Sequence, residues 1–93
     1  MYRILPSNKF LKDAKLLKKR SPKDLKILEE VIDILANHGH SGLKPKHRAH
    51  KLSGDYNNYW ECHVKPNLLL IWDENEVLML VELVRTGTHP DLF

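Results

Sequence analysis

The chain has 93 residues, of which 42% are hydrophobic and 29% are charged. This balance excludes intrinsic disorder, and no apolar run approaches the roughly 18 residues that suggest a membrane span. The length predicts one domain over residues 1–93, and the N-terminus lacks the apolar stretch of a secretory signal. We therefore expect a cytoplasmic protein that does not contact membranes.

The formal net charge of +3, with six neutral histidines, makes polyanions plausible partners. Charge of this size is also common on proteins that bind no nucleic acid, so the placement of the charges matters more. The single cysteine, Cys62, lies in an apolar predicted strand. It is therefore expected to be a small buried residue and not a reactive thiol.

The N-terminal third begins with a predicted strand at residues 2–5. Ser7 is a suitable N-cap for a helix that starts at Asn8 and ends at Arg20, where cations favour the helix C-terminus. One face of this helix is apolar. A different face carries a stripe of lysines that we expect to be exposed: Lys12, Lys15 and Lys19.

A second helix follows directly. Ser21 suits its N-cap and Pro22 its first turn, and apolar residues at helical spacing continue to Leu35 before residues 37–39 end the helix. Two amphipathic helices joined so closely form a hairpin, and its apolar side needs another surface to cover it.

The rest of the chain supplies that surface. A polar loop at residues 40–49 leads to three apolar segments with short links, which predict an antiparallel meander: 58–64, 68–73 and 77–85. The predicted fold class is α+β, with an N-terminal strand and a helical hairpin packed on one face of an antiparallel sheet, in the order β-α-α-β-β-β.

Alternation along the first of these strands separates polar from apolar side chains. Glu61 and His63 share one face with Tyr59, whereas Trp60 and Cys62 belong to the other. If the apolar face packs under the helices, a carboxylate and an imidazole lie side by side on the open face. That pair suits proton transfer, although a weak surface ion pair would give the same pattern.

Two further histidines, His50 and His89, lie at the ends of predicted elements, where side chains remain accessible to a large substrate. Cleavage of RNA by its own 2′-hydroxyl needs a base, an acid and cations near the phosphate, and imidazoles serve as both acid and base near neutral pH. Candidates for proton transfer are His50, Glu61, His63 and His89. Candidates for phosphate contact are Lys65 and Arg85, and candidates for base stacking are Tyr56, Tyr59, Trp60 and Phe93.

Metal binding is the second hypothesis, because several histidines fall close together in the sequence: His38, His40, His47 and His50. Their spacing lacks a paired-ligand pattern such as His-Glu-x-x-His. We therefore expect neither a metal nor another cofactor.

Four stretches of the C-terminal half carry a family resemblance: His50-Lys51-Leu52, Trp60 to Asn67, Leu68 to Trp72, and Arg85-Thr86-Gly87-Thr88-His89 through Phe93. They resemble the YafQ branch of the RelE/ParE toxins. The motifs cover residues 50–93, and the N-terminal half matches that family in layout.

The resemblance implies a toxin of a type II toxin–antitoxin pair, an endoribonuclease that cleaves messenger RNA in the ribosomal decoding site. Its implied partners are an antitoxin, the ribosome and mRNA. Glu61 and His89 become the leading acid–base residues, His50 and His63 would orient or stabilise the phosphate, and Phe93 would hold the RNA or shape the tail. The lysine stripe gains a second interpretation as a contact to ribosomal RNA.

Two positions depart from that family, which often has Asp where Asn67 stands and Arg where Trp60 stands. Asn67 can still position RNA by hydrogen bonds but carries no charge, and Trp60 moves phosphate binding onto Arg85, Lys65 or other cations. A third hypothesis is a protein of this fold without ribonuclease activity, one that binds an antitoxin or another target, as in the ParE branch. The histidine set favours RNA cleavage over it.

Overall fold

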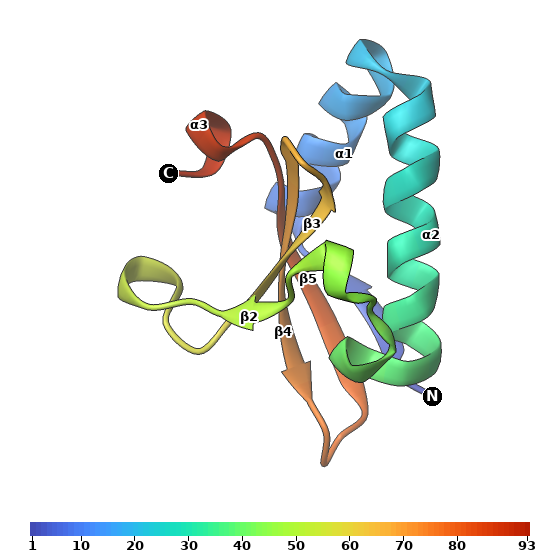
Figure 1. Ribbon diagram of the computed structural model, residues 1–93, viewed down its shortest axis with the longest axis vertical. Coiled ribbons are helices and arrows are strands. Elements are labelled where there is room, and N and C mark those ends of the chain that lie inside the picture. Colours follow the sequence, from blue (N-terminus) through green and yellow to red (C-terminus); the bar gives the residue numbers. More distant parts are fainter.

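The computed structural model describes all residues from 1 to 93, and its arrangement is drawn in Figure 1. No helix combines the length and the apolar character that crossing a membrane requires. The elements in chain order are β1 (Arg3–Pro6), α1 (Asn8–Arg20), α2 (Pro22–His38), the 3-10 turns η1 (Gly39–Gly42) and η2 (Pro45–His47), β2 (His50–Lys51), the 3-10 turn η3 (Gly54–Tyr56), β3 (Trp60–Lys65), β4 (Leu68–Asn75), β5 (Leu80–Gly87) and α3 (His89–Leu92).

The five strands form one sheet in the order β1-β5-β4-β3-β2. The meander is antiparallel as predicted, and the N-terminal strand β1, for which the sequence indicates no partner, pairs with β5 in parallel. A parallel pair needs a long connection between its strands, and the helical hairpin together with β2, β3 and β4 provides it. The two-residue strand β2 extends the opposite edge.

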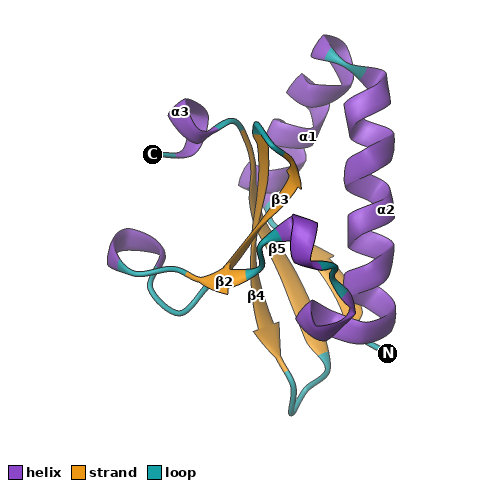
Figure 2. Ribbon diagram, in the orientation of Figure 1, coloured by secondary structure: helices purple, strands orange, loops and turns teal.

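The helical hairpin covers one face of the sheet, as predicted (Figure 2). Both predicted N-caps are confirmed, because Ser7 Oγ accepts from the Phe10 N–H and Ser21 Oγ accepts from the Asp24 N–H. The main core lies between these layers and is formed by Phe10, Leu28, Val31, Leu35, Cys62, Val64, Leu68, Leu70, Trp72, Val81 and Leu83.

The link between β4 and β5 differs from the prediction. Val77 was expected to start a strand, but the side chain of Asn75 accepts hydrogen bonds from the N–H groups of Val77 and Leu78. This local turn competes with strand pairing, so β5 begins only at Leu80.

The second face of the sheet is not open, contrary to the prediction. Helix α3 and the loop that carries η3 lie on this side, away from α1 and α2 (Figure 1). Leu92 of α3 joins Leu69 and Ile71 of β4 in a second, smaller apolar cluster. Four partly buried side chains complete it: Leu52, Tyr56, Tyr59 and Val84.

Candidate active site

The strand register places three of the predicted polar residues in one row across the second face. His50 of β2 is opposite Glu61 of β3, Glu61 is opposite Ile71 of β4, and Ile71 is opposite Arg85 of β5. Ile71 belongs to the second cluster, so its row neighbours face the same side. Residues distant in sequence therefore meet on the face that the helical hairpin leaves free.

His63 begins the adjacent row of the same face. It is opposite Leu69, which in turn is opposite Gly87 at the end of β5. Because His89 follows two residues later, this row leads directly to α3. The His63 Nδ1 atom lies 3.4 Å from the Pro66 carbonyl oxygen, a long contact that leaves the ring largely available.

The imidazole of His50 is fixed from both sides. Its Nδ1 lies 2.8 Å from the carbonyl oxygen of Arg48, and its Nε2 lies 3.3 Å from Glu61 Oε1. A carbonyl only accepts, so Nδ1 donates to Arg48 and Nε2 is the ring nitrogen that faces the carboxylate. His50 and Glu61 therefore form a histidine–carboxylate pair.

Glu61 is only 6% exposed, which corrects the prediction of a surface carboxylate. One of its oxygens, Oε2, is buried without any hydrogen-bond partner. An unsatisfied buried acceptor costs about 1–3 kcal/mol, so its retention suggests a role that needs a free acceptor. The carboxylate contacts His50 through one oxygen and has no hydrogen-bond partner on the other.

The chain after β5 forms the four-residue helix α3, which starts at His89. Thr88 and Asp91 close its first turn through a reciprocal cap. The Thr88 backbone and side-chain hydrogen bonds are the main cause of the lowered pKa of Asp91. This cap fixes the position of His89, whose ring is exposed, relative to the end of β5.

Aromatic rings surround His89. The ring centroids of His89 and Phe93 are 4.8 Å apart, and Phe93 meets Tyr56 edge to face at 5.8 Å. Phe93 is 54% exposed, which leaves ring surface free for stacking. Trp60 instead packs against the main core and stacks on His40 at 4.0 Å, as its apolar position in the strand indicates.

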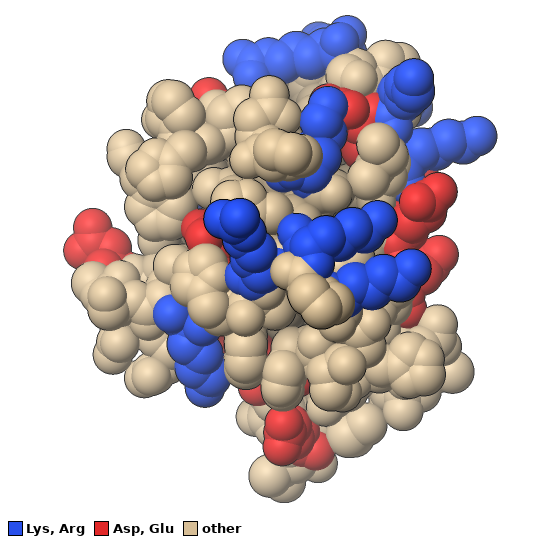
Figure 3. Space-filling model, in the orientation of Figure 1, with Lys and Arg blue, Asp and Glu red and all other residues tan.

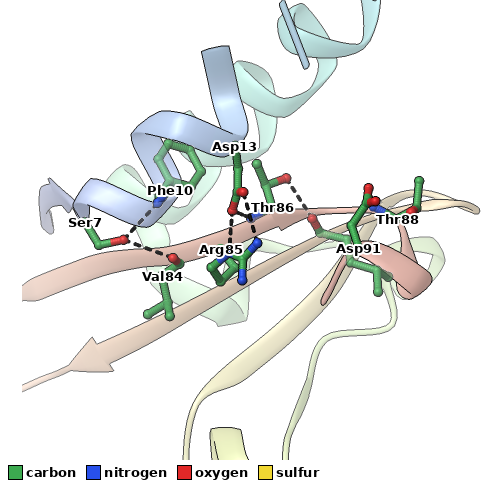
Figure 4. Close-up of polar contacts among 9 residues, drawn as sticks. Ser7, Phe10, Asp13, Val84, Arg85, Thr86, Thr88 and Asp91 are labelled. Atoms are coloured by element: carbon green, nitrogen blue, oxygen red, sulfur yellow. Dashed lines mark hydrogen bonds and ion pairs between the residues drawn. The ribbon is translucent and has the colours of Figure 1, made fainter. Parts of the chain in front are cut away.

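Two predicted phosphate-binding cations are already paired. Arg85 makes two hydrogen bonds to the carboxylate of Asp13 on α1, at 2.6 and 3.1 Å, and these bonds are the main cause of its raised pKa (Figure 4). Lys65 pairs with Asp24 at 3.2 Å. Each would have to contact a phosphate while shared with a carboxylate.

The remaining predicted contacts lie outside the strand rows that carry His50 and His63. Asn67 is exposed in the β3–β4 turn and lines a cavity of about 280 Å³ together with Arg85 and Thr88. The lysine stripe is exposed on α1, in the layer that covers the opposite side of the sheet: Lys12, Lys15 and Lys19. Their predicted contact to ribosomal RNA therefore belongs to a separate surface.

The histidines of the metal hypothesis have separate partners. His50 pairs with Glu61, and His47 Nδ1 accepts the Lys44 N–H. His40 is near Glu74 and Glu76, and ligand atoms of these three residues lie within 4.8 Å of one another. The Glu74 carboxylate there already accepts from the His40 backbone and ring and from Trp72 Nε1, an arrangement that fastens η1 to β4.

Sequence patterns missed the residues that support the site. Arg48 has a left-handed backbone, with φ 50°, that presents its carbonyl to His50. His47 is 5% exposed, and burial, followed by the charges of Lys46 and Lys44, lowers its pKa. Neither residue belongs to a strand or helix pattern, and only their closeness to His50 in sequence pointed to them.

The fold and this site define a small α+β domain that holds a histidine–carboxylate pair on the sheet face opposite its helices. Comparison with known proteins makes the class specific. Residues 2–93 match the family model described as bacterial toxin of type II toxin-antitoxin system, YafQ. The chain therefore belongs to the YafQ toxin family.

Toxins from two organisms are similar to this chain in sequence and in fold. The chain is 36% identical to the mRNA interferase toxin YafQ of Escherichia coli strain K12 over 94% of its own length and 90% of that protein. The crystal structure of YafQ from E. coli strain BL21(DE3) superposes with a TM-score of 0.88 at 32% identity, covering 100% of this chain and 99% of the other. The crystal structure of a metal-bound toxin from Helicobacter pylori gives 0.86 at 41% identity, with both chains fully covered.

Proposed function

We propose that this chain is an mRNA interferase: a single-domain toxin that cleaves ribosome-bound message by acid–base catalysis without a metal. Membership of the YafQ family supports the class, and the E. coli relative carries the name mRNA interferase toxin. The observation that carries the chemical part is the contact between the exposed imidazole of His50 and the buried carboxylate of Glu61, whose Oε2 has no hydrogen-bond partner.

In the proposed reaction, the Glu61 carboxylate accepts the proton of a ribose 2′-hydroxyl. The oxygen attacks the neighbouring phosphorus, the bond from phosphorus to the 5′-oxygen breaks, and His89 protonates the departing oxygen. The products are a 2′,3′-cyclic phosphate and a 5′-hydroxyl, so atoms and protons balance. His50, held by Arg48 and Glu61, and His63 orient and stabilise the phosphate.

We infer that the substrate is RNA held on the ribosome, because the two phosphate-binding candidates Arg85 and Lys65 are already paired with aspartates. Alignment of the 2′-hydroxyl with the phosphate would then come from the ribosome. Such a target places the protein in the cytoplasm. An antitoxin partner is inferred from the family and from the solved E. coli DinJ–YafQ complex, whose toxin is 33% identical to this chain with a TM-score of 0.87.

The test is cleavage of message bound to purified ribosomes by wild type and by four variants: His50→Ala, Glu61→Gln, His63→Ala and His89→Ala. His38→Ala is the matched control, because His38 is exposed at the end of α2. We expect large losses in the four site variants and none in the control. Normal cutting by all four would refute the site, and no cutting by wild type would favour a binding protein without ribonuclease activity.

Two additions to the assay test the remaining parts of the proposal. Cleavage of the same message without ribosomes should be much slower, and equal rates would refute ribosome dependence. Chelation followed by dialysis should leave the rate unchanged. A loss that added metal restores would refute the metal-independent mechanism.

A further inference from the structure

A run of unpaired cations leads up to His50. Residues 34–54 contain no Asp or Glu, and this stretch carries Lys44, Lys46, Arg48 and Lys51. None of the four belongs to an ion pair, in contrast to Arg20, Lys65 and Arg85. Figure 3 shows Lys and Arg side chains gathered over the middle of this face, where Figure 1 places β2 and the turn before it.

The segment 44–48, which we call the basic loop, borders a groove of about 640 Å³. Lys46 and Arg48 line one side, and His63 and Lys65 of β3 line the other. The groove exists because β2 pairs only with Trp60 and Glu61, so the edge of β3 beyond Glu61 has no strand beside it. Its size is within the range of small-molecule and nucleotide sites.

The backbone of the basic loop is defined by the buried side chain of His47 and by the conformation of Arg48. His47 is buried, and its Nδ1 accepts the Lys44 N–H at 3.0 Å. Arg48 has a left-handed backbone, which is unfavourable for a residue with a side chain. Arg48 thus joins groove and site, since its side chain lines the groove and its carbonyl binds His50.

We propose that the groove between the basic loop and β3 binds the sugar–phosphate backbone of the message beside the bond that is cut. The inference rests on the proposed function and adds a subsite to it. Unpaired cations along a groove suit a single RNA strand, whose phosphates they neutralise. The message is the expected occupant, and ribosomal RNA is not, because His63 lines the groove and Arg48 positions His50.

The experiment measures binding of a fluorescent RNA of about eight nucleotides, a length within the site sizes of single-strand binders. Every 2′-hydroxyl is methylated, so cleavage cannot interfere. The groove variant is Lys46→Gln with Arg48→Gln, and the control, Lys12→Gln with Lys15→Gln, removes two exposed charges from α1. Lys46→Gln alone is a second groove variant that leaves residue 48 unchanged. Lys46→Arg keeps the positive charge and should bind like the wild type.

The groove variant should bind more weakly and lower the slope of log affinity against log salt by about 0.7 for each lost phosphate contact. The control should keep the wild-type slope. Equal effects in both variants, wild-type binding by the groove variant, or no binding by the wild type would overturn the subsite. The subsite would also be wrong if the groove variant lost binding only to ribosomes without message, or only to an acidic antitoxin.

The cleavage assay keeps the two proposals separate. If the wild type cuts ribosome-bound message while the groove variant binds the oligonucleotide as the wild type does, only the subsite is wrong. If the groove variant loses oligonucleotide binding while the wild type cuts no message, the groove binds RNA and the proposed reaction is wrong.

Discussion

The two faces of the sheet are built differently. The face under α1 and α2 buries a continuous apolar cluster that includes Leu28, Leu70 and Trp72. The other face buries only three apolar residues fully, and beside them it holds Glu61 with one unsatisfied oxygen. Strained backbone also lies at the edge of this second face, at Arg48.

The difference separates what stabilises the fold from what serves a reaction. Apolar packing on the first face contributes favourably to folding wherever area is buried. A buried carboxylate oxygen and a left-handed arginine oppose folding and persist where the surrounding structure or a function retains them. Substitutions on the first face should therefore lower stability and leave activity unchanged. Substitutions on the second face should lower activity and change stability little.

The largest expected effect is on cleavage by Glu61→Gln. Removing the base should lower the rate on the order of 10² to 10⁴-fold. The unfolding free energy should stay within about 1 kcal/mol of wild type, because an unsatisfied buried charge is removed along with the His50 pair. Cleavage assays and urea unfolding of the same preparations measure both, with exposed Glu29→Gln as the control. If Glu61→Gln is much less stable than wild type and still cuts at the wild-type rate, the assignment of Glu61 as the base is wrong.

Leu28→Ala tests the first face. Leu28 is fully buried, so its truncation should lower the unfolding free energy by about 2–5 kcal/mol. Cleavage per folded molecule should not change at temperatures where the variant stays folded. Leu11→Ala is the control, because Leu11 is half exposed on α1. A specific loss of activity in folded Leu28→Ala would show that the two faces are coupled.

Asp13→Asn tests the link between the faces. Asp13 of α1 binds the Arg85 side chain and the Thr86 N–H at the edge of β5. Loss of its charge should lower the unfolding free energy by about 1–3 kcal/mol, with exposed Asp33→Asn as the control. If Arg85 binds phosphate, its release should also tighten RNA binding. Unchanged stability in thermal unfolding would show that the pair contributes nothing.

The smallest expected effect concerns pH. The pKa of His47 is lowered from 6.5 by burial, so the unfolded chain takes up a proton that the folded chain resists. The stabilising contribution of neutral His47 is complete above pH 6.5 and is lost as the pH falls toward the lower, folded-state pKa. His47→Asn keeps an acceptor for the Lys44 N–H and removes this titration. Its melting temperature should fall less on acidification than that of wild type, and equal falls would contradict the assignment.

Much of the fold could be predicted because local signals were strong. Ser7 and Ser21 cap the two helices as expected, and the buried thiol of Cys62, whose pKa burial raises to about 12, fits its place in an apolar strand. The parallel pairing of β1 with β5 could not be predicted, because a four-residue strand carries no signal for its partner. The turn at Val77 was missed because the side chain of Asn75 forms it.

The sequence predicted which residues belong to the candidate site better than it predicted their burial and their partners. Alternation placed Glu61 and His63 on one face correctly, yet it gave no sign that Leu92 would pack on that face or that Glu61 would be buried. Similarly, Arg85 was read as a free cation because its partner, Asp13, is 72 residues away. Long-range contacts of this kind leave no periodic pattern in the sequence.

The central claim of the proposed function is that His50 and Glu61 act as one catalytic unit, and a double-mutant cycle tests it most directly. Cleavage of ribosome-bound message is measured for wild type, His50→Ala, Glu61→Gln and the double variant. Residues that act as a unit are strongly non-additive, so the double variant should be no slower than the slower single variant. Losses that multiply, or single variants that cut like wild type, would contradict the account.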